Sequence, residues 1–162
     1  MPTNISIFVS ENSLGGSTFS SIVTAVFLCG GASAGMLFNK LNGKFGERVI
    51  AIAFLNLGLG LLICSQATIA PILLVGGFIG GCSISLFMSR LTLSISAKTN
   101  PVITPMALSL VLSSNNLGNF ISPTVIGLLP GTLVSERFLI VGILALIGAV
   151  IVGLTMKQNK TA

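Results

Sequence analysis

Residues 71–92 read PILLVGGFIGGCSISLFMSRLT, a continuous apolar run in which Arg90 is the only charged residue. A transmembrane helix needs about 20 mostly apolar residues, so this run predicts one membrane-spanning helix. Four further runs of similar character cover residues 19–38, 49–67, 106–129 and 137–156. Transmembrane β-strands alternate over only about ten residues, and these runs are longer and continuously apolar. The sequence therefore predicts an all-α membrane protein with about five transmembrane helices.

The centre of the opening run, GGFIGG at residues 76–81, contains two interleaved Gly-xxx-Gly pairs. Small residues at this spacing allow the backbones of two helices to approach closely. A phosphate-binding loop would need a following Lys and a Ser or Thr, which are missing here. We interpret these glycines as helix-packing residues.

The overall composition agrees with a membrane protein and excludes several functions. Hydrophobic residues make up 52% of the chain, charged residues 7%, and the mean hydropathy is +1.04. The net charge is +5, but the basic residues lie at the ends of apolar runs and form no dense patch with aromatic partners, which argues against nucleic-acid binding. The chain has no His, and its three acids, Glu11, Glu47 and Glu136, lie outside the apolar runs. We therefore predict no enzyme activity, no catalytic residue, no metal site and no cofactor.

The basic residues also predict an orientation in the membrane. Lys and Arg near helix ends are retained mostly on the cytoplasmic side. With the amino terminus outside, five crossings leave Arg137 outside and place six basic residues inside: Lys40, Lys44, Arg48, Lys98, Lys157 and Lys160. We expect a multi-pass protein of the cell membrane, with an external segment at 1–17, a five-helix bundle at 18–157 and a cytoplasmic tail at 158–162.

A family resemblance comes from the basic segment NKLNGKFGERVI at residues 39–50. It resembles the loop of the major facilitator superfamily that follows the second and eighth helices, approximately Gly-x-Leu-x-Asp-Arg/Lys-x-Gly-Arg/Lys-Arg/Lys. The matching positions are Leu41, Lys44, Gly46 and Arg48, whereas Asn39, Gly43 and Glu47 depart from the pattern. Residues 14–38 and 112–129 look like the eighth and eleventh helices of such a transporter.

The resemblance implies that the five runs are helices eight to twelve, part of the carboxyl-terminal six-helix bundle. It also implies membrane transport of a small solute or drug by a secondary carrier, with cation-coupled efflux the favoured subclass. The chain would then be a carboxyl-terminal fragment that is not active alone. Its partners would be the lipid bilayer, the substrate, and a missing amino-terminal half or a second copy. The alternative is a non-transporting structural or accessory membrane protein, or an inert gene fragment.

Two groups of residues are candidates for function on this reading. The substrate-cavity candidates are Ser113, Asn115, Asn116 and Asn119, which lie on a polar stripe of the fourth run, together with Arg90. The stripe could instead form hydrogen bonds between helices, and Arg90 could extend its long side chain to the interface. The second group is a cytoplasmic gating loop with tight turns at its glycines, comprising Leu41, Gly43, Lys44, Gly46 and Arg48. The alternative is that the basic residues of this loop only set the orientation of the chain in the membrane.

Overall fold

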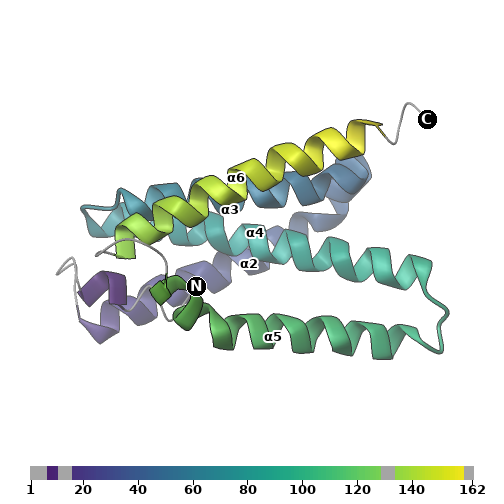
Figure 1. Ribbon diagram of the computed structural model, residues 1–162, viewed down its shortest axis with the longest axis horizontal. Helices are drawn as coiled ribbons and strands as arrows, with labels where there is room; N and C mark the ends of the chain where they lie inside the picture. The colour runs from purple at the N-terminus through teal and green to yellow at the C-terminus, as the bar shows by residue number, and fades with distance from the viewer. Residues whose placement is uncertain (1–6, 11–15, 129–133, 159–162) are drawn as a thin grey trace.

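The computed structural model describes residues 7–10, 16–128 and 134–158, and every regular element in these ranges is helical (Figure 1). The elements are α2 (Ser17–Phe45), the short 3₁₀ helix η1 (Gly46–Arg48), α3 (Val49–Ser65), α4 (Ala70–Lys98), α5 (Thr104–Leu128) and α6 (Val134–Gln158). Residues 7–10 add one helical turn. The predicted all-α fold is confirmed.

Three stretches of the described chain are long and apolar enough to cross a membrane. They are Thr18–Ser65, Ala70–Lys98 and Val134–Thr155. The first contains both α2 and α3, which are separated by the turn at η1. Helix α5 is not among them, because its asparagines and serines lower its hydropathy. The chain is thus a multi-pass membrane protein, and the crossing by α5 stays a prediction.

Helix α2 extends beyond its predicted end at residue 38 and finishes at Phe45. Gly43 lies inside the helix, so the expectation of a tight turn at Gly43 is wrong. The turn occurs at Gly46, which has φ 56° and ψ −125°. Side chains clash with the backbone in this conformation, whereas glycine adopts it at little cost. One glycine therefore ends α2, and the predicted loop is only a few residues long.

Helix α4 is the centre of the packing. It lies between α2 and α3, and α3 in turn packs against α6 on its other side. Helices α2 and α3 are consecutive in the chain but barely touch each other. Helix α2 depends on α4 for its contacts, whereas α3 packs on both α4 and α6.

The glycines of α4 are divided between its two neighbours. A Cβ atom on Gly81 would overlap the carbonyl oxygen of Phe27 in α2. A Cβ atom on Gly76 would lie 3.0 Å from the carbonyl oxygen of Gly60 in α3. Each of these contacts joins backbone to backbone, so only glycine fits at both positions. The predicted packing role of GGFIGG is confirmed, with one glycine pair facing each neighbouring helix.

Two clusters of buried apolar side chains hold the bundle on either side of these glycines. One includes Phe8, whose ring stacks on that of Phe138 in α6 with centroids 5.6 Å apart. The other contains Ala34 of α2, Val49 and Ala53 of α3, and Leu86 of α4. The turn at residues 7–10 is thereby anchored to the bundle, since Phe8 is completely buried.

Helix α5 differs from the longer helices of the bundle because none of its residues is buried. Its main neighbour is α4, to which a short turn connects it (Figure 1). The side chain of Asn100 stabilises this turn by accepting a hydrogen bond from the backbone N–H of Val102 at 3.1 Å. The turn positions α5 alongside the bundle, with most of its circumference open.

Candidate functional site

The turn between α2 and α3 is tied to α4 by Arg90. The guanidinium Nη1 of Arg90 donates a hydrogen bond of 3.0 Å to Oδ1 of Asn42, near the end of α2. Its Nη2 lies 3.6 Å from Oε1 of Glu47 in η1. Arg90 therefore connects three helical elements at one end of the bundle.

The two contacts of Arg90 differ in strength. The side chain of Arg90 is 14% exposed, whereas that of Glu47 is 64% exposed. Solvent screens an ion pair with so exposed a partner, and such pairs contribute only about 0–1 kcal/mol. The hydrogen bond to Asn42 is shorter and lies in a partly buried setting. The amide of Asn42 is therefore the stronger partner, and Glu47 adds a weaker, salt-sensitive attraction.

The predicted gating residues surround this contact. Leu41 packs against the buried cluster of Ala34 and Leu86. The ammonium of Lys44 lies 5.6 Å from the ring centroid of Phe45, and Arg48 is exposed just before α3. The hydrogen bond and the ion pair of Arg90 go to Asn42 and Glu47, not to these predicted residues. Their role in gating stays a prediction.

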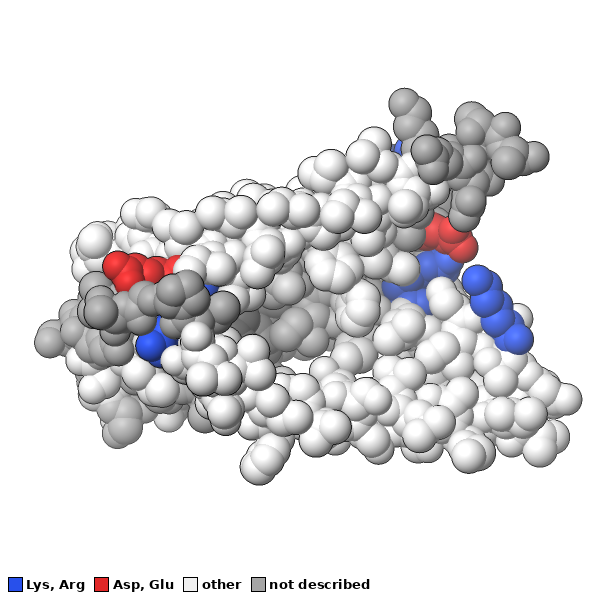
Figure 2. All heavy atoms as spheres, viewed as in Figure 1, with Lys and Arg blue, Asp and Glu red and all other residues white. Residues whose placement is uncertain are grey.

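On the face shown in Figure 2, charged side chains gather at the two ends of the molecule, and the middle carries no charged side chain. The helix directions place the end of α2, the start of α3 and the end of α4 together. The basic side chains described at this end are Lys40, Lys44, Arg48, Arg90 and Lys98. At the opposite end, the part of the chain that the structure describes has Arg137 as its basic residue. The bundle is thus electrically asymmetric along its length.

A hollow of about 410 Å³ lies between α4 and α5. We call it the α4–α5 hollow; its lining residues are Phe87, Met88, Leu91, Leu110, Val111, Ser114 and Asn115. Asn115 is half-buried there, whereas Ser113, Asn116 and Asn119 are exposed. Arg90 does not line this hollow, so the structure does not bring Arg90 and Asn115 into one site.

The polar stripe of α5 is directed mainly away from α4. Ser114 and Asn115 line the hollow. Asn116 lies about 160° around the helix from Ser114, whereas Asn119 lies about 40° from Asn115, at the side of the helix. In the described chain, Ser109 and Ser114 donate hydrogen bonds to carbonyl oxygens of α5 itself, and Thr104 donates to the turn that precedes the helix. The asparagine amides on the outer side are thus available to a partner or to water.

The sequence analysis missed Asn42 as the partner of Arg90. Asn42 falls on a variable position of the loop pattern, and 48 residues separate it from Arg90. Glu47 was noted as a departure from the basic pattern, and its carboxylate lies beside Arg90. Glu47 stands where the family pattern has a basic residue, and this exchange was the sequence signal that a basic side chain lies next to the loop.

The sequence model of the Major Facilitator Superfamily matches residues 2–162. Comparisons with curated proteins and with solved structures gave no match. Because the family match covers nearly the whole chain, this protein belongs to the Major Facilitator Superfamily, a family of membrane transporters.

Proposed function

We propose that this chain is part of a secondary transporter that moves a small solute or drug, with α2 to α6 as helices eight to twelve of the complete carrier. The observation that carries the proposal is the polar face of α5, where Asn116 is exposed on the side away from α4 and Asn119 is exposed beside it. Cation-coupled efflux is the subclass that we favour from the family resemblance. No enzymatic step is part of this proposal.

The physical argument is the cost of exposing amides to lipid. An unpaired amide in hydrocarbon costs several kcal/mol, so Asn116 and Asn119 must face protein or a water-filled cavity. Carriers of this kind place their substrate site between two halves of the molecule. We infer that an amino-terminal half, or a second copy, lies opposite α5 and that the two enclose the cavity. Ser113 and Asn115 would line the same cavity from its edges.

The concentration of basic side chains at one end of the bundle supports an orientation of the chain in the membrane. The end with Lys40, Lys44, Arg48 and Lys98 would be cytoplasmic, in accordance with the retention of positive charge on that side of the cell membrane. The turn held by Arg90 would then be a cytoplasmic one. In the proposed cycle, the contacts of Arg90 with Asn42 and Glu47 hold the ends of α2, α3 and α4 together in one state and loosen in the other.

Cysteine accessibility tests the cavity without knowledge of the substrate. Asn116→Cys and Asn119→Cys are made in a chain whose three native cysteines are replaced by Ala. The matched control is Ile147→Cys, on the apolar helix α6, where the side chain is 51% exposed. A charged, membrane-impermeant thiol reagent should label the two α5 positions much faster than position 147, because the reacting thiolate forms in water. Equal, slow labelling at all three positions would overturn the water-filled cavity.

The size of the native polypeptide tests the fragment proposal separately. An antibody to the tail MKQNKTA, residues 156–162, is used on membranes of the source cells. A band of the size of a twelve-helix carrier supports the end of a working transporter. A band at 16.6 kDa would favour the alternative, a non-transporting accessory protein or an inert gene product.

A further inference from the structure

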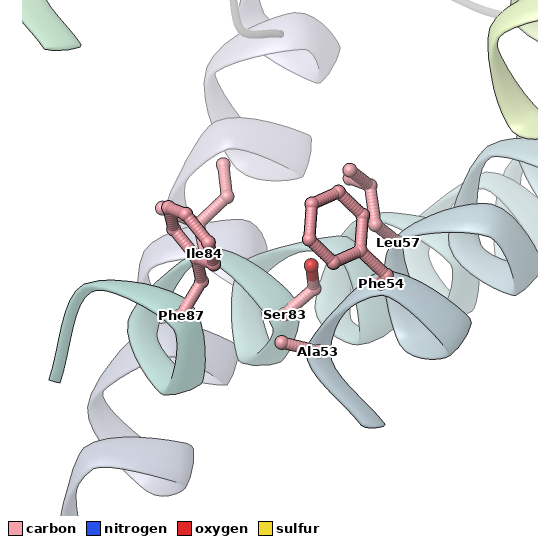
Figure 3. Close-up of a pocket in the computed structure, with 6 residues that line it drawn as sticks. All are labelled: Ala53, Phe54, Leu57, Ser83, Ile84 and Phe87. Carbon is pink, nitrogen blue, oxygen red and sulfur yellow. The ribbon is translucent and has the colours of Figure 1, made fainter. Parts of the chain in front are cut away.

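A second, smaller pocket lies between α3 and α4, away from the polar face of α5. Its volume is about 150 Å³. We call it the Ser83 pocket; its lining residues are Ala53, Phe54, Leu57, Ser83, Ile84 and Phe87 (Figure 3). The first three belong to α3 and the others to α4. Phe87 also lines the α4–α5 hollow, so its ring stands between the two spaces.

Ser83 is the only polar side chain among these six residues. It is 2% exposed, and its hydroxyl is directed into the space between the rings of Phe54 and Phe87 (Figure 3). The hydroxyl makes no hydrogen bond to any residue in the described ranges, not even to the preceding turn of its own helix. The hydroxyl is open to the pocket, so an occupant that forms a hydrogen bond with it gains affinity.

The shape and lining of the pocket limit what can occupy it. The rings of Phe54 and Phe87 are 5.7 Å apart at 74°, an edge-to-face arrangement that leaves aromatic surface open to a third ring. A water molecule needs two or more polar partners, and this lining offers a single hydroxyl. An apolar cavity of about 150 Å³ holds a molecule of the size of benzene.

We propose that the Ser83 pocket binds a small aromatic molecule of phenol size that carries one hydrogen-bonding group. The ring packs against Phe54 and Phe87, and its polar group pairs with the hydroxyl of Ser83. This site is separate from the cavity proposed for transport, and it does not depend on that function.

Fluorine NMR of the full chain in lipid nanodiscs tests the proposal with two matched probes, 4-fluorophenol and fluorobenzene. The wild type should bind both saturably and should prefer the phenol. Ser83→Ala should remove the preference, a loss of about 2- to 10-fold in affinity for the phenol, because one hydrogen bond is deleted. Ser85→Ala is the matched control, since Ser85 lies on the same helix beside Gly31 and Gly35 of α2 and does not line the pocket.

A filling variant, Ala53→Leu, provides a second measurement. It should abolish saturable binding of both probes, because the added side chain occupies the pocket. Nanodiscs without protein correct for partition of the probes into lipid. Absence of saturable binding to the wild type, which would result if another helix covers the pocket, overturns the proposal. So does an unchanged preference in Ser83→Ala, and this second result remains decisive if Ala53→Leu fails to fold.

Discussion

Replacing Gly60 by Ala tests whether backbone contact between α3 and α4 holds the bundle. A Cβ atom at Gly60 would lie 2.9 Å from the backbone N of Gly80 and 3.0 Å from the carbonyl oxygen of Gly76. Ordinary van der Waals contact begins at 3.4 Å. Both blocking atoms are backbone and cannot turn aside, so the two helices must separate by about 0.5 Å at this level.

The expected cost follows from that separation. A gap of this size removes about a quarter of the dispersion energy of each contact, and overpacking of this kind costs about 1–3 kcal/mol. Ala in place of Gly within a helix returns about 0.8–1 kcal/mol. We expect Gly60→Ala to lower the free energy of unfolding by about 0–2 kcal/mol. Gly118→Ala, in α5, should raise it by up to about 1 kcal/mol, because a Cβ atom there meets nothing within 4 Å.

The comparison of these two variants isolates the helix contact, since the gain in helix propensity is common to both. Reversible unfolding of the full chain in mixed micelles, followed by far-ultraviolet circular dichroism as the fraction of denaturing detergent rises, gives the two free energies. The difference should be about 1–3 kcal/mol in favour of Gly118→Ala. If Gly60→Ala proves as stable as Gly118→Ala, the contact does not determine the packing and the reasoning is refuted.

Two further pairs of substitutions probe the turn, with the same unfolding measurement. Gly46→Ala should destabilise the chain by about 1–2 kcal/mol, because a φ of 56° is unfavourable for a residue with a side chain. Gly43→Ala should be neutral or stabilising, because Gly43 lies inside the helix with open space around it. Equal effects of the two variants would contradict the assigned turn. Glu47→Gln should lower the free energy of unfolding by less than about 1 kcal/mol, and Asn42→Ala should lower it by about 1–3 kcal/mol. The reason is that only Asn42→Ala removes the closest acceptor of Arg90. The reverse order would show that the ion pair with Glu47 dominates.

The helices and their glycine contacts could be predicted from sequence because both depend on short-range patterns. A continuous apolar run of helix length has few stable alternatives in a bilayer, and the spacing of Gly76, Gly77, Gly80 and Gly81 places two pairs on the helix surface. The end of α2 was predicted too early. Gly43 and Gly46 look alike in sequence, and only the backbone geometry shows which of them makes the turn.

The contacts of the candidate site depend on how distant segments cross, which a single sequence does not reveal. The pairing of Arg90 with Asn42 requires α2 and α4 to lie side by side at that level. The stripe of α5 was visible as a pattern, but the sequence could not indicate that Ser114 faces α4 while Asn116 faces outward. The unpartnered hydroxyl of Ser83 was likewise invisible, because burial and orientation are tertiary properties.

The central place of α4 has a consequence for biosynthesis. A chain emerging from the ribosome releases α2 and α3 before α4, yet these two helices barely touch and each has its glycine contact on α4. A newly inserted α2–α3 hairpin consequently has no interface of its own, and the two helices stay free to separate in the lipid. Translation must proceed through residue 98 before the first compact unit can assemble, which leaves the nascent hairpin open to membrane chaperones or proteases until then.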